Sequence, residues 1–192
     1  IYVDGTLGGG GYTRAILDAA DCTVLGIDRD PDAISRNEPL LEIYGARLML
    51  VPGRFGDMDA LVRGLGFDAV HGVTLALWVS APQIDEAERG CSFAKDGPLD
   101  MRMERVGESA ADVVNTASEE DLSNIVFRLG EERHARRVAR AIVRARTETG
   151  FETTAQLAHV DRSVVPESRK THVHTATRTF HAIRTPVHDE TG

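Results

Sequence analysis

The chain has 192 residues, of which 42% are hydrophobic and 27% charged, and its formal net charge is -8 at pH 7. These values are ordinary for a globular protein, no apolar run approaches membrane-spanning length, and the acidic charge argues against indiscriminate nucleic-acid binding. The two cysteines, Cys22 and Cys91, are isolated from each other, which favours a reducing, cytoplasmic setting.

The first half of the chain alternates predicted strands with predicted helices. We expect strands over residues 1–4, 23–28, 48–51 and 69–77, and helices over residues 12–20, 31–44 and 58–65. Pro39 should kink or break the second helix, because proline lacks the N–H that a helix interior needs. Strands separated by helices indicate a parallel sheet with right-handed crossovers.

A glycine-rich loop joins the first predicted strand to the first predicted helix. It reads Asp4-Gly5-Thr6-Leu7-Gly8-Gly9-Gly10-Gly11, and its glycines let a ligand approach the backbone because no Cβ intervenes. The helix that follows offers unpaired N–H groups to an oxygen-rich ligand. The second strand ends at Asp28, where a carboxylate can accept hydrogen bonds from ribose hydroxyls. Together these features indicate a nucleotide-like cofactor.

The spacing of the glycines bears on which cofactor is bound. The dinucleotide pattern Gly-x-Gly-x-x-Gly/Ala would place Thr13 or Arg14 at its last position. This departure favours S-adenosylmethionine, which has no pyrophosphate, over NAD. A nicotinamide-dependent oxidoreductase is the alternative that the loop and Asp28 alone would allow.

The second half of the chain is predicted to be irregular at first and then helical. Residues 78–108 are rich in Pro, Gly, Asp and Glu, and a connection of this length is usually functional or disordered. Helices are expected over residues 109–116, 119–129, 131–146, 154–165 and 175–188. Pro186 should end the last of them early.

Arginine side chains gather on one face of the helix expected over residues 131–146. They recur at helical spacings of three and four: Arg133, Arg136, Arg137, Arg140 and Arg144. A charged stripe is usually a solvated face, but guanidinium groups without interleaved acids repel one another unless an anion lies near. We therefore predict contact with an RNA backbone, with Arg178 in a second basic patch.

Histidines near the end of the chain do not have the spacing of a metal site. His174, His181 and His188 are seven residues apart, whereas two ligands on one helix are typically spaced by four. We therefore expect no bound metal.

Several motifs occur together and in the same order as in a known family. They are the glycine loop, Ile27-Asp28-Arg29-Asp30-Pro31, Pro82-Gln83, Ala87-Glu88-Arg89-Gly90, Asp96-Gly97-Pro98-Leu99-Asp100-Met101-Arg102-Met103, Gly130-Glu131-Glu132-Arg133 and Ala176-Thr177-Arg178-Thr179-Phe180. With this combination the chain resembles the bacterial 16S rRNA (cytosine-N4)-methyltransferase family over essentially all 192 residues. The run from Asp96 to Met103 is highly specific to that family.

The resemblance implies an α/β fold, a Rossmann-like class I methyltransferase sheet with a helical insertion. It implies S-adenosylmethionine as methyl donor and a cytidine of small-subunit rRNA, or of the assembled small ribosomal subunit, as target. We expect a cofactor-binding domain over residues 1–108, the insertion over residues 109–174, and a helix over residues 175–192 returning toward the first domain. Because the family has further strands, the chain is expected to be truncated at both ends.

The resemblance also implies site residues, and it exposes departures from the family. Cofactor contacts are expected from Gly10, Gly11, Tyr12, Asp28, Phe55 and Gln83. Ala76 replaces the family's acid at the end of the fourth strand, and Trp78 replaces a glycine. An acceptor for the cytosine amine is then expected from Ser80, Asp100 or main-chain carbonyls. The alternative is a catalytically impaired homologue that retains RNA and cofactor binding.

Overall fold

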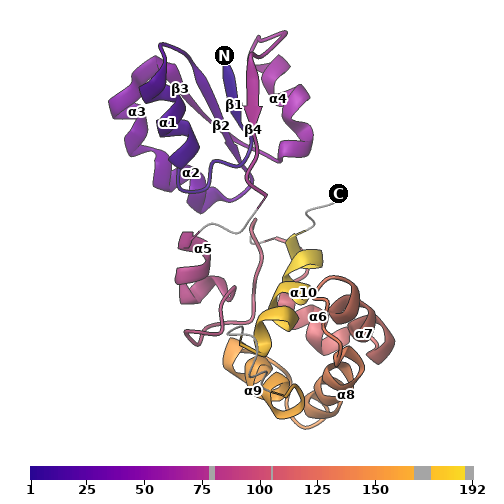
Figure 1. The fold of residues 1–192 in the computed structure, drawn as a ribbon. Coiled ribbons are helices and arrows are strands. Elements are labelled where there is room, and N and C mark those ends of the chain that lie inside the picture. Colours follow the sequence, from indigo (N-terminus) through magenta and orange to yellow (C-terminus); the bar gives the residue numbers. More distant parts are fainter. Residues whose placement is uncertain (78–80, 105, 167–173, 189–192) are drawn as a thin grey trace. The chain divides into compact units, whose positions relative to one another are not determined.

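The chain forms two compact units that divide between Ala81 and Pro82. The computed structural model describes residues 1–77, 81–104, 106–166 and 174–188 (Figure 1). The sequence had placed the division near residue 108. The structure differs because the segment after Pro82 supplies Leu99 and Met101 to the core of the helical unit.

The first unit contains a parallel sheet, as the alternation of strands and helices predicted. Its strands are β1 (Tyr2–Asp4), β2 (Val24–Asp28), β3 (Leu48–Pro52) and β4 (Gly72–Thr74), in the order β3-β2-β1-β4. Strand β4 is shorter than predicted, because the three residues of β1 are the ones with which it pairs. Asp4 is opposite Gly26 in β2, so Asp4 and Asp28 both lie toward the carboxyl edge of the sheet.

Helices cover both faces of this sheet (Figure 1). They are α1 (Gly11–Ala19), α2 (Pro31–Asn37), α3 (Pro39–Tyr44) and α4 (Met58–Gly64), with 3-10 turns at Gly45–Arg47 and Phe55–Asp57. The break between α2 and α3 falls at Pro39, which confirms the prediction for that residue. Val62 of α4 packs with Leu25 and Ile27, whereas Leu17 of α1 packs with Val24, since successive strand residues face opposite sides.

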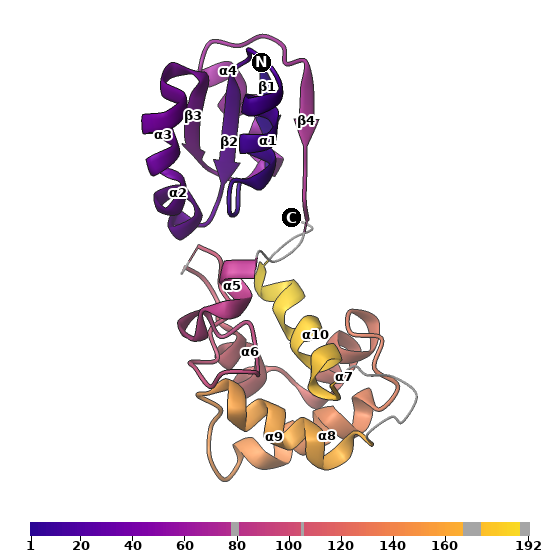
Figure 2. The same cartoon turned by 60° about the vertical axis from the view of Figure 1, so that its left-hand side comes forward.

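The second unit is built of helices around its own core. It contains α5 (Ala81–Asp85), a 3-10 turn at Ala87–Arg89, α6 (Ala110–Thr116), α7 (Glu119–Arg128), α8 (Ala135–Arg146), α9 (Thr154–Val164) and α10 (Ala176–His188). Helices α8 and α9 lie side by side (Figure 2). No helix in the described part of the chain is long and apolar enough to cross a membrane.

Helix α10 belongs to the core of this second unit. Its Ala176, Phe180 and Ile183 are buried in the helical core, and the expectation that this helix returns toward the first domain stays a prediction. The prediction that Pro186 ends the helix early is wrong, since α10 continues to His188. Pro186 removes one helical hydrogen bond, the one that an N–H at this position would donate to the Ala182 carbonyl, and only two residues of the helix follow it.

The run from Asp96 to Met103 joins two helices of the second unit. Asp96 Oδ1 accepts the N–H of Ala155 at 3.0 Å, which satisfies a free donor in the first turn of α9. The N–H of Leu99 donates to the Glu152 carbonyl at 2.8 Å. This motif therefore fixes the start of α9 to the loop that precedes α6.

Candidate functional site

The glycine loop bends sharply between β1 and α1. Gly8 and Gly10 have φ angles of 49° and 75°, in the left-handed region that glycine adopts without steric cost. The N–H of Gly10 donates to the Leu7 carbonyl at 2.7 Å, and the N–H of Leu7 donates to the Ile27 carbonyl at 2.9 Å. The first hydrogen bond closes a turn within the loop, and the second fixes the loop to β2.

Asp28 connects the end of β2 to this loop. Its Oδ2 accepts the N–H of Gly8 at 2.8 Å, and its Oδ1 accepts the N–H of Asp30 at 2.9 Å. Burial raises the pKa of Asp28 above its ordinary value, and these two hydrogen bonds oppose that rise. Each carboxylate oxygen can accept a further hydrogen bond, so Asp28 retains capacity for a ligand hydroxyl.

Asn37 supports the same loop from the end of α2, and sequence reasoning missed it. Its Nδ2 donates to the Gly8 carbonyl at 2.9 Å and to the Ala33 carbonyl at 2.8 Å. The side chain is 1% exposed, and its buried Oδ1 has no hydrogen-bond partner within the described residues. A Cβ added at Gly10 would collide with that oxygen. A polar residue on the buried face of α2 was the signal available in the sequence.

Asp4 holds the beginning of the loop in place. It is fully buried, and it accepts hydrogen bonds from the Thr13 hydroxyl at 2.8 Å and the Thr6 N–H at 3.3 Å. Burial raises the pKa of Asp4, and these donors oppose the rise. The Thr6 hydroxyl in turn accepts the N–H of Ala76 at 2.7 Å. Ala76 is therefore fixed to the loop at the carboxyl edge of the sheet.

The side of the glycine loop that carries Gly9 and Gly11 is open to solvent. A Cβ added at Gly9 or Gly11 would meet nothing within 4 Å, and the Tyr12 side chain is 57% exposed. Within the described part of the chain, the N–H groups of Gly11 and Tyr12 have no acceptor. The loop and the first turn of α1 therefore offer free donors to a ligand with oxygen atoms.

Phe55 lies at the same edge of the sheet. It begins the 3-10 turn after β3, and its Cβ lies 3.5 Å from a Cβ added at Gly5. The first unit thus brings together five of the predicted cofactor residues: Gly10, Gly11, Tyr12, Asp28 and Phe55.

Gln83 and Asp100, two other predicted site residues, belong to the second unit. Gln83 is buried, and its Nε2 lies 3.8 Å from Met103 Sδ. Asp100 accepts hydrogen bonds from Arg102 Nε at 2.8 Å and Nη2 at 2.6 Å. Burial acts to raise the pKa of Asp100, but Arg102 holds it below the ordinary value. Ser80 and Trp78 lie outside the described residues.

The predicted arginine stripe is exposed on α8 and on the turn before it. Ala135, Val138, Ala139 and Ile142 fill the opposite, buried face of the helix. Arg140 Nε lies 3.6 Å from Glu119 Oε1.

Arg178 lies apart from this stripe, on α10. Its Nη1 is 3.8 Å from Glu132 Oε2 and 3.5 Å from the Glu131 carbonyl oxygen. It therefore takes part in the contact between α10 and the turn that precedes α8.

Comparison with known proteins gives a consistent result along the whole chain. The sequence model of the MraW methylase family matches residues 1–192. A protein of Paramagnetospirillum magneticum named ribosomal RNA small subunit methyltransferase H is 55% identical over 192 residues, which are all of this chain and 60% of that protein. Proteins of the same name from Parvibaculum lavamentivorans and Hyphomonas neptunium are 55% and 56% identical, with 57% and 56% of their lengths covered. The chain spans less than two thirds of these relatives.

Proposed function

This chain belongs to the MraW methylase family, and we propose that the protein methylates N4 of a cytidine in small-subunit (16S) rRNA. S-adenosylmethionine is the proposed methyl donor. One observation carries the proposal for this chain's own residues: the hydrogen bond between Asp28 and Gly8 joins the strand-end carboxylate to an open glycine loop.

The residues of the first unit fit this cofactor. The free N–H groups of Gly11 and Tyr12 suit the carboxylate of an amino acid, and Asp28 suits two ribose hydroxyls. Phe55 supplies an apolar surface for the adenine ring. When bound, the cofactor supplies a methyl group that its sulfonium has already activated. The protein's own task is to position the two reactants and to exclude water.

The second task of the chain is to accept the protons of the target amine. The lone pair of the cytosine amine is delocalised into the ring, so an acceptor for its N–H groups increases the density on nitrogen. Ala76 cannot serve, because its side chain has no acceptor. We assign this role to Asp100, Ser80 or the carbonyls near Leu77. Asp100 is ionised at neutral pH, since Arg102 keeps its pKa low.

The helical unit supplies the surface for rRNA in this proposal. The stripe on α8 and its preceding turn presents guanidinium groups that bind phosphate in a bidentate manner. The proposal rests on the stripe rather than on Arg178, which already contacts Glu132. The reducing cytoplasm is the compartment where such a substrate occurs.

A second candidate function is a homologue that binds cofactor and RNA without catalysis. The observation that favours it is Ala76, where the family resemblance calls for an acid. The experiment is methyl transfer from labelled S-adenosylmethionine to unmodified small ribosomal subunits, using the full-length protein and its Ala76→Asp variant. We expect transfer by the protein and a higher rate for the variant.

The outcomes of this experiment separate the alternatives. Cofactor binding in calorimetry without transfer by either protein would favour the non-catalytic homologue. Binding of NADH in place of S-adenosylmethionine would overturn the proposed activity in favour of an oxidoreductase.

A further inference from the structure

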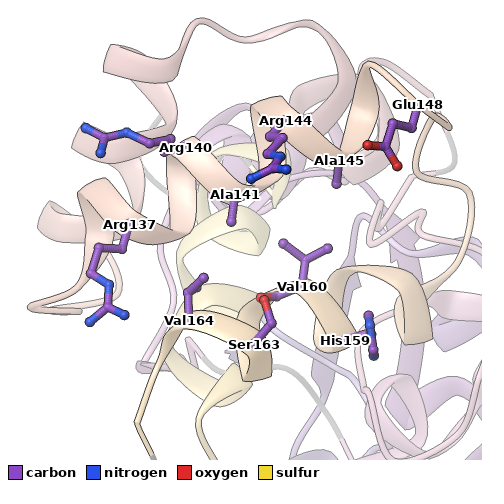
Figure 3. Close-up of a pocket in the computed structure, with 10 residues that line it drawn as sticks. All are labelled: Arg137, Arg140, Ala141, Arg144, Ala145, Glu148, His159, Val160, Ser163 and Val164. Carbon is purple, nitrogen blue, oxygen red and sulfur yellow. The ribbon is translucent and has the colours of Figure 1, made fainter.

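A groove of about 490 Å³ separates α8 from α9 in the helical unit (Figure 3). We propose that this groove binds one nucleotide of a single-stranded RNA segment, with its phosphate at the arginines of α8 and its base on the apolar floor. The inference rests on the proposed function, and it names the form of RNA that the helical unit recognises. Pockets of roughly 300–1,000 Å³ are typical for ligands of this size.

The phosphate end of the groove is formed by α8. Arg137, Arg140 and Arg144 line it. Arg140 is engaged by Glu119 at 3.6 Å, whereas Arg137 and Arg144 have no ion-pair partner among the residues that the structure describes. Two unengaged guanidinium groups on one wall create a site for an anion, and phosphate matches their planar donor geometry.

The floor of the groove is apolar and made of small side chains. Ala141 and Ala145 of α8 face Val160 and Val164 of α9, and all of them are partly exposed (Figure 3). Among the described residues, no side chain fills the space between them, so a planar base can enter and leave water there. Arg144 lies beside this floor, so a phosphate that its guanidinium binds would hold the attached base close to the floor.

Polar groups at the rim suit the edge of a base. Ser163 Oγ donates to the Val160 carbonyl at 2.6 Å, which leaves its lone pairs free to accept. His159 also lines the groove, and Glu148 lies at the opposite end from Arg137 (Figure 3). A carboxylate repels phosphate and accepts from an exocyclic amine, so the groove has one end for phosphate and one for a base.

The form of the groove favours single-stranded RNA over a duplex. A duplex keeps its bases stacked and presents phosphates on a convex surface, so its bases cannot reach a recessed floor. A stripe that only attracts phosphate would bind both forms through charge alone. The recess beside the stripe therefore distinguishes this proposal from general electrostatic attraction.

The test compares variants that remove equal charge from inside and outside the groove. Arg137→Ala/Arg144→Ala removes the unengaged groove arginines, and Arg133→Ala/Arg136→Ala removes two exposed arginines that do not line it. Fluorescence anisotropy measures binding of a short cytidine-rich single strand and of the matched duplex, at two salt concentrations. We expect the groove variant to lose at least tenfold in single-strand affinity and to lose its preference over duplex. The control variant should weaken both forms by a similar, smaller factor.

A second pair of variants tests shape without removing charge. Ser163→Trp fills the groove, whereas Asn124→Trp places the same ring on an exposed position of α7 that does not line it. We expect only Ser163→Trp to weaken binding of the single strand, with duplex binding unchanged. Circular dichroism and thermal unfolding identify any variant that has lost its fold. If a variant of the arginine pair or of the tryptophan pair is lost in this way, the remaining pair tests the proposal.

Three results would overturn the inference. The first is equal loss from the groove and control arginine pairs, which would reduce the effect to net charge. The second is unchanged single-strand binding by Ser163→Trp. The third is that the protein binds an acidic peptide rather than RNA in the groove, so that Ser163→Trp releases the peptide and leaves RNA binding unchanged.

If groove variants retain single-strand affinity while the protein methylates small subunits, the groove proposal fails and the proposed function stands. If single-strand binding depends on the groove but no methyl group is transferred, the groove stands and the proposed activity fails.

Discussion

The carboxylate of Asp28 accepts a hydrogen bond from the backbone N–H of Gly8 at 2.8 Å. This contact joins the end of β2 to the loop after β1, across 20 positions of the sequence. The two features that indicate a nucleotide-like cofactor therefore hold each other in place. The oxygens that orient the loop are also the ones that we propose accept hydrogen bonds from the ribose of the cofactor.

Replacing Asp28 should reduce both stability and cofactor affinity. Asp28→Ala leaves the N–H groups of Gly8 and Asp30 without their acceptor, which costs about 1–3 kcal/mol in unfolding free energy. S-adenosylmethionine affinity should fall at least tenfold, as measured by calorimetric titration. Asp59→Ala, which removes an exposed carboxylate paired with Arg63, is the matched control and should change neither quantity appreciably. Wild-type affinity in Asp28→Ala would contradict the assignment.

Gly10 and Gly9 should respond differently to alanine. Gly10 has a φ of 75°, and a Cβ there would meet the Asn37 amide, so Gly10→Ala should cost about 1–3 kcal/mol in unfolding free energy. A Cβ at Gly9 meets open space, so Gly9→Ala should stay within about 0.5 kcal/mol of wild type. The methyl group of Gly9→Ala would still occupy the space proposed for the cofactor and should lower its affinity. Normal affinity in a stable Gly9→Ala would place the ligand elsewhere.

Gly130 permits the close approach of α10 to the turn before α8. A Cβ there would lie 2.5 Å from the Arg178 carbonyl oxygen and 2.9 Å from Ala182 Cβ. Gly130→Ala should therefore destabilise the protein by about 1–3 kcal/mol in chemical denaturation. Gly150→Ala is the control in the same unit, because its nearest neighbour, Asn115 Oδ1, lies at 3.6 Å. Equal stability of the two variants would show that α10 does not depend on this approach.

Asp161 should make stability fall as pH rises above its ordinary pKa. Burial raises the pKa of Asp161 in the folded protein, while the Thr179 hydroxyl that donates to it opposes the rise and Glu132 adds to it. The protonated carboxyl is thus favoured by folding, and that stabilisation is lost as pH rises through the folded pKa. Asp161→Asn lacks this dependence, so its unfolding free energy should gain on that of wild type as the pH rises above the ordinary pKa of an aspartate.

Urea denaturation at several pH values measures this difference. The charge of His174 also acts on Asp161 and opposes the rise of its pKa. Introducing His174→Ala into both wild type and Asp161→Asn separates the contribution of His174 to the pH dependence from that of Asp161. A pH-independent difference between Asp161→Asn and wild type would mean that the carboxyl is ionised throughout.

Elements that depend on local chemistry were predictable from the chain. Alternating strands and helices predicted the parallel sheet, and Pro39 predicted the break between α2 and α3. The start of α8 was placed too early, because Glu131 adopts a φ of 52° that only the surrounding turn imposes. Helix α5 was missed, since its five residues are too few to show a periodic pattern.

The residues of the candidate site also fall into those that the sequence predicted and those that depend on tertiary packing. Gly10, Gly11 and Asp28 were predicted, because glycine's conformational freedom and a strand-end carboxylate are readable without a structure. Asn37 was missed, because its role depends on the Gly8 carbonyl, 29 positions away. The contact of Arg178 with Glu132 could not be predicted, because it depends on how α10 packs, and the assignment of Arg178 to RNA stays a prediction.

The chain by itself determined where the backbone can turn, where helices end, and which helix face carries the arginines, since these follow from each residue's own φ preferences, hydrogen-bonding groups and spacing. Only the tertiary structure decided which carboxyl groups are desolvated and which arginines form an ion pair with a carboxylate. Desolvation and ion pairing arise between groups that the sequence separates, so Asp161 and Arg140 acquire their environments only when the helices pack.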